Sequence, residues 1–447
     1  RILPVFGNGK ERLIIQFILS IFYRIFFPII AIVLSPYYLR RMLRRGGYGN
    51  KIAYRLGRWP ELGPKKSGAK RIWIQAVSVG EVSSISKLLN SLSEEKNIEI
   101  VLSGTTSTGL NFAESKFGHL LAAYGPFPLD WVLFSSQAWK KIDPDLVVMV
   151  DSELWPEHFQ QARNRGIPIF IINARLSDRT FSRLIKLKGF HSLLFPENLT
   201  VVTASERQYA RWQVLGLSDK EIYTSGNLKI DSVDRNRFTS SKRNQLIDEF
   251  GFQESSIVLA GISTWKGEEK LLIEIVQTLR LENLDIRLLL VPRHAERREE
   301  VMGTLRTCEL PFQVRTRDKI AKEGNVVYLA DTTGELASLV GVAGFGFMGK
   351  TLPPNKGGQN PIEPIALGIP LVVGPNYQNF HETCTDMFLH GAAIKTQNRS
   401  EVVKQLLQLA KSENKRKELK LACAEWMEKQ GSPSAFTLKV IKKKLEI

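Results

Sequence analysis

The stretch WIQAVSVGEV, Trp73–Val82, decides how this chain folds. Its apolar, β-branched part predicts a buried parallel strand over Ile72–Val77, and this strand ends in Ser78, a glycine turn and one acid, Glu81. The residues that follow have a helical pattern. Open α/β sheets place their chemistry at the carboxyl ends of parallel strands, so Glu81 is a candidate catalytic carboxylate. The alternative is a helix-start glutamate that only complements the helix dipole.

Strands of this kind recur along the chain and alternate with helical patterns. Candidate strands in the first half are Ile72–Val77, Ile98–Ser103, Leu146–Val150, Pro168–Asn173 and Leu199–Ala204. Those in the second half are Ser256–Gly261, Ile286–Val291, Val326–Leu329, Val340–Phe345 and Pro370–Val373. Candidate helices include Val82–Ser93, Glu157–Arg165, Glu268–Leu281, Glu296–Thr307, Gly334–Ser338 and Pro361–Ala366. This alternation predicts an α/β protein with two Rossmann-like domains facing each other across a cleft.

We expect four segments along the 447 residues. Residues 1–47 form an N-terminal anchor with a basic segment, 48–235 the first Rossmann-like domain and 236–430 the second. The polar stretch 236–248 is a candidate link between them. Residues 431–447 are expected to be helical, and a return to the first domain is one arrangement for them.

The positive charge is concentrated at the N-terminus. Residues 1–71 hold fifteen Lys or Arg and two acidic residues, a net +13 of the chain's +17. A nucleic-acid-binding protein would carry basic and aromatic residues across a folded face, so we expect no nucleic acid partner. The three cysteines are far apart and the histidines lack metal-ligand spacing. We therefore expect no disulfide framework and no metal, and a reducing compartment.

The longest apolar run, Leu13–Leu34, is long enough to span a bilayer. Arg24 and Pro28 interrupt it, and an arginine at the bilayer centre is costly, so an anchor lying in the interface is the rival to a spanning helix. Tyrosines and a basic cluster follow, which predict a cytoplasmic location and contact with anionic lipid on that side. These residues are Tyr37, Tyr38, Arg40, Arg41, Arg44, Arg45, Lys51, Arg55 and Arg58.

Polar loops follow further strands of the first half. They are SGTTSTG (Ser103–Gly109), DSELWP (Asp151–Pro156), NARLSDRT (Asn173–Thr180) and GNLKID (Gly226–Asp231). The first offers N–H groups and hydroxyls to an anion or sugar, and Asp151 and Glu153 could hold hydrogen-bond donors of a substrate. Arg175 and Arg179 could bind a phosphate or carboxylate, and Lys229 could stabilise developing charge. Helix caps and solvated surface charges are the alternative for each loop.

Four loops of the second half are comparable. They are GISTWKGEE (Gly261–Glu269), PRHAER (Pro292–Arg297), DTTGEL (Asp331–Leu336) and GGQNPIEP (Gly357–Pro364). Ser263, Thr264 and the neighbouring N–H groups have the pattern of an anion nest. Arg293 suits a nucleotide phosphate, and Glu363, in the first turn of a helix, could hold ribose hydroxyls. Together the loops predict a nucleotide in the second domain and an acceptor in the first.

In this order, WIQAVSVGEV and the eight loops resemble the Kdo transferases, which transfer 3-deoxy-D-manno-oct-2-ulosonic acid during lipopolysaccharide assembly. The match runs from about Tyr48 to Asn379. The resemblance implies an inverting GT-B glycosyltransferase that uses CMP-Kdo as donor and a lipid A precursor (lipid IVA) as acceptor. It also implies an inner-membrane enzyme on the cytoplasmic face, bound to anionic lipid, with no metal and no cofactor other than its donor substrate.

The resemblance assigns roles residue by residue. It makes Glu81 the catalytic base, and Glu153 and Lys229 the groups that stabilise the transition state. CMP-binding residues by the same resemblance are Ser263, Thr264, Pro292, Arg293, Thr333, Gly334, Glu335, Asn360, Pro361, Ile362 and Glu363. Three departures stand out: Gln75 and Gln359 replace histidines usual in the family, and GKTL at Gly349–Leu352 replaces GGSL.

Two other classes of function remain open from the sequence. One is a different GT-B enzyme, either a transferase with another nucleotide sugar or a nucleotide-sugar epimerase. The other is a non-catalytic, membrane-anchored protein that binds CMP or lipid.

Overall fold

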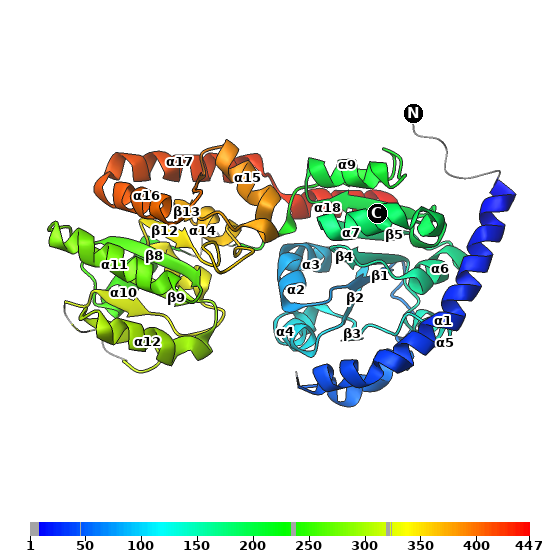
Figure 1. The fold of residues 1–447 in the computed structure, drawn as a ribbon. Coiled ribbons are helices and arrows are strands. Elements are labelled where there is room, and N and C mark those ends of the chain that lie inside the picture. Colours follow the sequence, from blue (N-terminus) through cyan, green and yellow to red (C-terminus); the bar gives the residue numbers. More distant parts are fainter. Residues whose placement is uncertain (1–8, 45, 234–237, 319–321, 323) are drawn as a thin grey trace. The chain divides into compact units, whose positions relative to one another are not determined.

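In the computed structural model of the chain (Figure 1), residues 9–44, 46–233, 238–318, 322 and 324–447 are described. The chain divides into two compact units. The first consists of Arg1–Ser232 with Ser432–Ile447, and the second of Val233–Gly431. The boundary expected between residues 235 and 236 lies outside the described residues.

The first unit is built on a seven-stranded parallel sheet with the order β3-β2-β1-β4-β5-β6-β7. Its strands are β1 (Lys70–Gln75), β2 (Ile98–Gly104), β3 (Ala123–Pro126), β4 (Leu146–Val150), β5 (Ile169–Ala174), β6 (Leu199–Thr203) and β7 (Ile222–Thr224). The chain winds outward in one direction from β1 to β3 and in the other from β4 onward. The neighbouring ends of β1 and β4 are therefore the switch point at which such sheets bind ligands.

Both faces of this sheet are buried, as the continuous apolar strands predict. In β1, Trp73 packs into one core cluster, and Ile72 and Ile74 pack into another.

Helices and 3-10 turns surround the sheet of the first unit. They include α1 (Gly9–Leu43), η1 (Gly49–Leu56), α2 (Val79–Ser84), α3 (Ser86–Glu94), α4 (Ser107–Phe117), α5 (Val132–Ile142), α6 (Pro156–Asn164), α7 (Asp178–Lys186), α8 (His191–Leu194), α9 (Glu206–Val214), η4 (Leu228–Ile230) and α18 (Pro433–Leu445).

The last helix, α18, belongs to the first unit. Asp231 accepts hydrogen bonds from the backbone N–H of Ser434 (2.6 Å) and from Lys87 of α3 (3.0 Å). Ile441 of α18 is completely buried in a core cluster of this unit. The C-terminal residues thus complete the fold that the N-terminal half begins.

The second unit has its own seven-stranded parallel sheet, with the order β10-β11-β9-β8-β12-β13-β14. Its strands are β8 (Ile257–Thr264), β9 (Ile286–Pro292), β10 (Phe312–Val314), β11 (Val327–Leu329), β12 (Phe345–Met348), β13 (Leu371–Val373) and β14 (Ala393–Lys395). Here the winding reverses between β8 and β12. The prediction of two Rossmann-like α/β units is confirmed.

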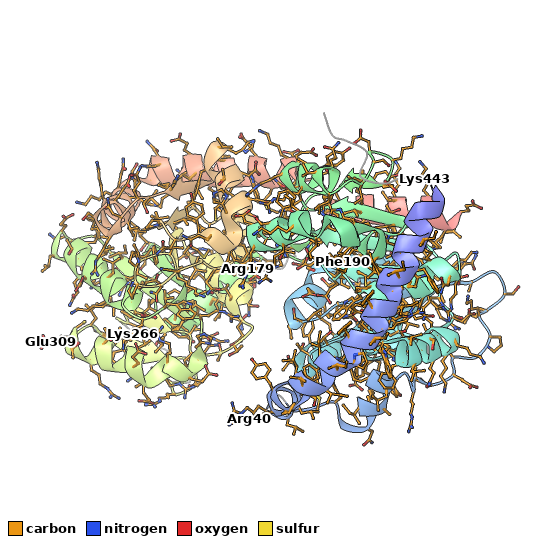
Figure 2. All side chains as sticks on the ribbon, turned by 45° about the vertical axis from the view of Figure 1, so that its right-hand side comes forward. Arg40, Arg179, Phe190, Lys266, Glu309 and Lys443 are labelled. Atoms are coloured by element: carbon orange, nitrogen blue, oxygen red, sulfur yellow. The ribbon has the colours of Figure 1, made fainter. Side chains whose placement is uncertain are left out.

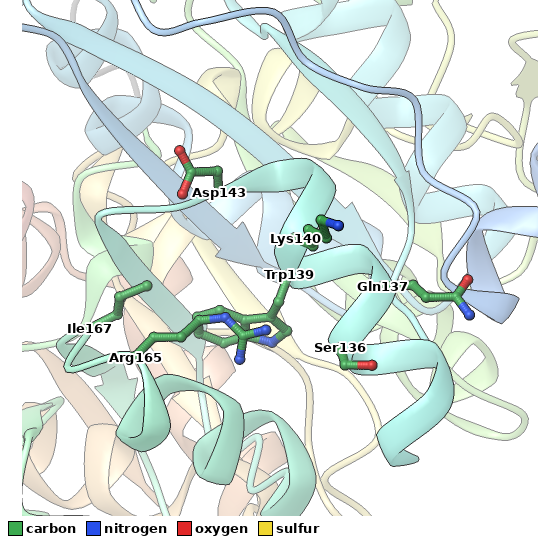
Figure 3. A pocket seen from close by; sticks show the side chains of 7 residues that line it. All are labelled: Ser136, Gln137, Trp139, Lys140, Asp143, Arg165 and Ile167. Carbon is green, nitrogen blue, oxygen red and sulfur yellow. The ribbon is translucent and has the colours of Figure 1, made fainter.

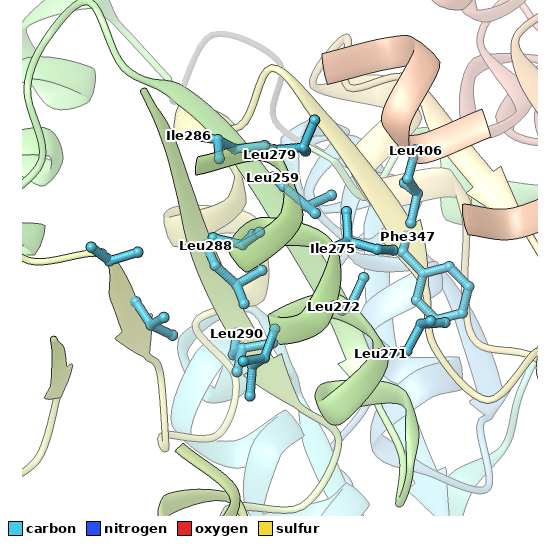
Figure 4. Packing of buried hydrophobic residues seen from close by; sticks show 14 of the residues in the cluster. Leu259, Leu271, Leu272, Ile275, Leu279, Ile286, Leu288, Leu290, Phe347 and Leu406 are labelled. Carbon is cyan, nitrogen blue, oxygen red and sulfur yellow. The ribbon is translucent and has the colours of Figure 1, made fainter. Parts of the chain in front are cut away.

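Helices cover this second sheet. They are α10 (Ser240–Phe250), α11 (Glu268–Leu281), α12 (Arg298–Thr307), α13 (Leu336–Leu339), α14 (Ile362–Ala366), α15 (His381–Leu389), α16 (Arg399–Lys411) and α17 (Glu413–Lys429). Figure 4 shows Leu272 and Ile275 of α11 among strand residues such as Leu288 and Phe347, all part of one buried cluster. The spacing of the apolar residues on α11 is that of a helix packed on a sheet.

Two predictions about the second unit are wrong. The strand expected over Val340–Phe345 is a 3-10 turn (Val340–Val342), and β12 begins only at Phe345. A short apolar run does not distinguish a strand from a buried turn. The link expected over residues 236–248 is, in its described part, mostly the start of α10, whose Leu246 and Ile247 are buried.

Helix α1 lies along the surface of the first unit, with Arg40 near its C-terminal end (Figure 2). Arg24 forms a two-pronged ion pair with Glu157 of α6, with N–O distances of 2.8 and 3.0 Å. Tyr23 donates a hydrogen bond to the buried carboxylate of Asp130 (2.6 Å). The arginine that interrupts the apolar run is therefore neutralised by the folded unit.

The opposite side of α1 is apolar and exposed. Its exposed large side chains include Phe17, Phe22, Ile25, Phe26, Ile29, Ile30, Ile32, Val33, Leu34 and Tyr37. The segment Gln16–Arg40 is long and apolar enough to cross a membrane. A soluble protein rarely exposes so continuous an apolar face, so this side needs an apolar partner.

The variant Arg24→Met tests the attachment of α1. It leaves Glu157, whose side chain is 2% exposed, without its cation, and we expect the free energy of unfolding to fall by about 3 kcal/mol. Thermal unfolding in detergent micelles measures this loss. The double variant Arg24→Met/Glu157→Gln is the control and should recover most of it, because no unpaired charge remains. An unchanged unfolding temperature for Arg24→Met would show that the ion pair does not hold the helix.

Candidate functional site

The candidate site of the first unit begins at Glu81, in the first turn of α2, directly after β1. Its carboxylate accepts hydrogen bonds from the backbone N–H of Val77 (2.6 Å) and from the hydroxyl of Ser78 (3.2 Å). These bonds fold the side chain back over the turn, so Glu81 is held in place and half-buried. Glu81 therefore does stabilise the start of α2, as the alternative interpretation predicts. Its carboxylate nevertheless lies beside the switch point of the sheet.

Three carboxylates gather at this switch point. The pKa of Glu81 is raised to about 7, mainly by burial and in smaller part by the negative charges of Asp151 and Glu153, which follow β4. Burial also raises the pKa of Glu153 to about 7, although Trp155 donates a hydrogen bond to it (2.8 Å). Carboxylic acids that exchange protons near neutral pH are unusual, and such groups are typical of sites that move protons.

A network of polar side chains joins the loops around these acids. Asp151 has a positive φ of 64°, and it accepts hydrogen bonds from Asn173 (2.6 Å) and Arg175 (2.9 Å). The buried Asn173 in turn accepts a bond from the backbone N–H of Leu228 (3.0 Å). Asn173 thereby couples the loop after β4 to η4, which carries Lys229 and contacts α2. The structure thus brings Glu81, Glu153 and Lys229 to one edge of the first unit.

Gln75 organises the neighbouring loop, Ser103–Gly109. Its side chain is completely buried, accepts a hydrogen bond from Ser103 (2.7 Å) and donates one to Thr105 (3.2 Å). At Gly109 a Cβ atom would lie 2.8 Å from the Thr106 hydroxyl and 3.1 Å from the backbone of Ser78, so this position requires glycine. The departure from histidine at position 75 therefore affects the packing beneath the loop.

In the second unit, the switch point is occupied by a carboxylate of the protein itself. Glu268, at the start of α11, is 1% exposed and accepts hydrogen bonds from the backbone N–H groups of Trp265, Lys350, Thr351 and Leu352, at 2.8 to 3.2 Å. In the turn after β8, Glu268 binds the backbone N–H of Trp265, and the anion nest expected at Ser263 and Thr264 stays a prediction. Glu268 ties the loops after β8 and β12 together.

The predicted donor residues around this turn differ in accessibility. Ser263 is half-buried with a positive φ of 52°, at a bulge where β8 and β9 shift register. Thr264 and Pro292 are buried. Arg293 is exposed at the end of β9, and its backbone N–H donates to the carbonyl of Thr264 (3.1 Å). Of these four, Arg293 has the side chain that is most accessible to a ligand.

The turn Thr333–Gly334–Glu335 is held by Arg315. The Nε and Nη2 atoms of Arg315 each lie 3.0 Å from an oxygen of the Glu335 carboxylate, and these hydrogen bonds lower the pKa of Glu335. Thr333 and Gly334 are exposed, and Gly334 has a φ of 84°. Glu335 therefore positions the turn through Arg315, while Thr333 and the Gly334 backbone remain accessible. No hydrogen bond of a helix cap is found at Glu335.

The glycine-rich loop before α14 depends on close backbone contacts. At Gly357, whose φ is 108°, a Cβ atom would lie 2.5 Å from the Asn379 amide. Asn360 accepts a hydrogen bond from Ile362 N–H (3.2 Å) and donates one to Glu363 (3.3 Å). Glu363 lies in the first turn of α14, as predicted. Pro361 and Ile362 are buried, so only their backbone could contact a ligand.

A pocket lies at the edge of the first sheet that is opposite to the candidate site. It has a volume of about 600 Å³ and lies near the amino ends of β4 and β5 (Figure 3). It is lined by Ser136, Gln137, Trp139, Lys140, Asp143, Arg165 and Ile167. None of the predicted site residues contributes to it. Across the described part of the chain, no group of three or more His, Cys, Asp and Glu could hold a metal ion, and the absence of a metal stays a prediction.

Sequence reasoning missed several residues that build these sites. Asn173 and Glu268 lie inside motifs that we singled out, but their partners are distant in sequence: Leu228 for the first and Lys350 for the second. Arg315 lies outside every motif, and Gln75 was noted only as a departure. Bonds of this kind depend on the tertiary structure, although a polar residue within an apolar strand, as at Gln75, is a usable signal.

Comparison with known proteins adds an independent line of evidence. A family model described as 3-deoxy-D-manno-octulosonic-acid transferase (kdotransferase) matches residues 50–232. A relative named 3-deoxy-D-manno-octulosonic acid transferase, from Haemophilus influenzae, is 29% identical over 354 residues, which is 78% of each chain. A relative of the same name from Chlamydia pneumoniae is 26% identical and covers 84% of this chain and 85% of its own.

Among solved structures, a UDP-GlcNAc 2-epimerase from Neisseria meningitidis has the same fold. It aligns with a TM-score of 0.54 and 12% identity, over 83% of this chain and all of that one. This likeness concerns the fold alone.

The raised pKa of Glu81 has a measurable consequence for stability. In the folded state the pKa of Glu81 is about 7, against an ordinary value of 4.5, so folding favours the protonated acid. The folded state therefore loses stability as the pH rises from 4.5 to about 7. Glu81→Gln removes this loss. Urea unfolding should therefore show the variant gaining stability relative to the wild type from pH 5 to pH 8. Glu94→Gln, on the exposed end of α3, is the control for removal of a carboxylate, and parallel curves for Glu81→Gln and wild type would contradict the raised pKa.

Proposed function

We propose that the chain is a 3-deoxy-D-manno-octulosonic acid (Kdo) transferase, which transfers Kdo from CMP-Kdo to a lipid A precursor, lipid IVA. It is a glycosyltransferase of lipopolysaccharide core biosynthesis. The observation that supports the proposed chemistry is Glu81, a carboxylic acid with a pKa of about 7 at the switch point of the first sheet. The donor and acceptor follow from the family resemblance.

In the proposed reaction, Glu81 takes a proton from a hydroxyl group of the acceptor sugar. The hydroxyl oxygen forms a bond to the anomeric carbon of Kdo, and the bond from that carbon to the CMP phosphate oxygen breaks on the opposite face. The configuration is inverted, through a transition state with oxocarbenium character. A base with a pKa near the working pH combines a large ionised fraction with useful basicity.

The leaving phosphate gains negative charge during this step and requires cations or N–H donors. Arg293 is accessible at the end of β9, and we assign it to the phosphate. Lys229 is the corresponding group of the first unit, on η4 beside α2. Glu153 is expected to hold an acceptor hydroxyl or to stabilise positive charge on the sugar when it is ionised.

The experiment that tests the function combines CMP-Kdo with a tetraacyl lipid A precursor and measures the product mass. Glu81→Gln should reduce the transfer rate by roughly 10²–10⁴-fold, the range for removal of a general base, while CMP binding is kept. The wild-type rate should rise with pH through an inflection near 7, because only ionised Glu81 accepts the proton. Glu94→Gln is again the matched control.

Three outcomes would contradict the proposal. Near-normal turnover by Glu81→Gln would remove Glu81 from the role of base. A wild type that uses UDP- or ADP-sugars in place of CMP-Kdo would indicate another transferase or an epimerase. Binding of CMP without any product would indicate a non-catalytic binding protein.

We also propose that the enzyme works at the cytoplasmic face of the inner membrane, with α1 embedded in the interface. The exposed apolar face of α1 supports membrane contact, and its ion pair with Glu157 supports the interfacial arrangement. A spanning helix would have to carry Arg24 and its partners to the bilayer centre or break the pair, and both are costly. An interfacial helix keeps every contact.

The basic residues after α1 support the same location in part. Arg40 and Arg44 are exposed and could contact anionic lipid, while the side chains of Arg41 and Arg45 lie outside the described residues. Arg55, expected in the same cluster, is buried and donates to the carbonyl of Phe127. That part of the prediction is wrong, because the charge is used inside the fold.

A labelling experiment distinguishes the two anchors. Ile14→Cys and Leu43→Cys place single thiols at exposed positions near opposite ends of α1, in a Cys308→Ser background with Cys384 and Cys423 buried. In inverted inner-membrane vesicles, a membrane-impermeant maleimide should label both thiols, because an interfacial helix keeps both ends on one side. A thiol that reacts only after the vesicles are permeabilised would establish a spanning helix.

A further inference from the structure

We propose that Lys350 is a donor-binding residue, whose ammonium group contacts an anionic oxygen of the nucleotide sugar. Lys350 follows β12 at the switch point of the second sheet and belongs to the segment GKTL. The inference rests on the proposed function, since a CMP-linked acid sugar carries two such groups, the phosphate and the sugar carboxylate.

The backbone of Lys350 is fixed on both sides. Its N–H donates to the buried carboxylate of Glu268 (2.8 Å), and its carbonyl accepts from the N–H of Gly358 (3.0 Å). Gly358 belongs to the glycine-rich loop that leads to Asn360 and Glu363. Lys350 therefore joins the loop after β12 to a loop already assigned to the donor.

The side chain of Lys350 is also held. Its Nζ atom lies 4.4 Å from the centre of the Trp265 ring, a cation–π contact. His294 packs edge-on against the same ring, with ring centres 5.3 Å apart. Trp265 follows β8, His294 follows β9 and Lys350 follows β12, so adjacent strands bring them together at one edge. The aromatic face holds the ammonium group in place without neutralising its charge.

Within the described part of the chain, this positive charge has no acidic partner. Among the described residues, no carboxylate forms an ion pair with Lys350 or with Arg293, and both side chains are accessible to solvent. By contrast, Arg297 and Arg298, just beyond β9, are paired with acids. Arg293 follows β9 and Lys350 follows β12, the two strands that flank β8, and two such cations create a local positive potential that an anionic ligand would neutralise.

The backbone conformation supports a role for the side chain. Lys350 has a φ of 62°, in the left-handed region, where a lysine costs free energy that a glycine would not. The preceding Gly349 lies so close to β8 that a Cβ atom would meet the Ser263 carbonyl at 2.2 Å, so the backbone cannot relax easily. A lysine kept at such a position is consistent with a function of its charge.

The test compares Lys350→Met, which keeps most of the stem and removes the charge, with Lys350→Arg, which keeps the charge. Lys266→Met, an exposed lysine of the loop after β8, is the matched control. Calorimetry measures the Kd for CMP, and steady-state kinetics measures KM and kcat with CMP-Kdo. Unfolding temperatures check that each variant is folded.

The two anionic groups give different results. If Lys350 contacts the phosphate, Lys350→Met should raise the Kd for CMP roughly tenfold or more. If it contacts the sugar carboxylate, the Kd for CMP stays unchanged and the KM for CMP-Kdo rises by a similar factor. In either case Lys350→Arg should restore most of the affinity, and Lys266→Met should have little effect.

Changes below twofold in both the Kd and the KM for folded Lys350→Met would overturn the inference and leave the proposed function intact. Failure of the wild type to transfer Kdo would overturn the proposed function. The Kd for CMP of Lys350→Met would still test whether Lys350 contacts the phosphate. A wild type that neither binds CMP nor uses CMP-Kdo would overturn both.

Discussion

The candidate site of the first unit depends on the close approach of three carboxylates at the carboxyl ends of β1 and β4. Glu81, Asp151 and Glu153 are partly withdrawn from water and repel one another, which keeps Glu81 protonated to unusually high pH. Asp151 remains in place because Asn173 and Arg175 bind it. Without that anchoring, the acids could move apart and the pKa of Glu81 would return toward its ordinary value.

The second unit uses a buried carboxylate for the opposite purpose. Glu268 accepts four backbone hydrogen bonds and gives a fixed shape to the loops after β8 and β12. Its oxygens occupy the N–H groups that Rossmann-like folds often offer to a phosphate. Arg293 and Lys350 add side-chain cations that are accessible at the ends of β9 and β12 of this unit.

Helix α1 is linked by hydrogen bonds to the candidate site of the first unit. Tyr38, near its C-terminal end, shares a hydrogen bond with Tyr48 (3.0 Å), and Tyr48 donates to the carbonyl of Thr105 in the loop beside Glu81. With the Arg24–Glu157 pair, this chain of contacts sets the position of the loop Ser103–Gly109 relative to α1.

The sequence by itself determined the alternation of strands and helices, the position of Glu81 and the sites at strand ends, because apolar periodicity and turn residues are local signals. It correctly predicted β4 and α11 to the residue, but missed the short edge strands β3, β7, β10 and β14, which have too few apolar residues to stand out. Only the tertiary structure decided that Arg24 is paired, that Arg55 is buried and that Glu268 ties the loops after β8 and β12 together. These outcomes depend on partners far away in the chain, and the charge of a side chain alone does not reveal which partner will neutralise it.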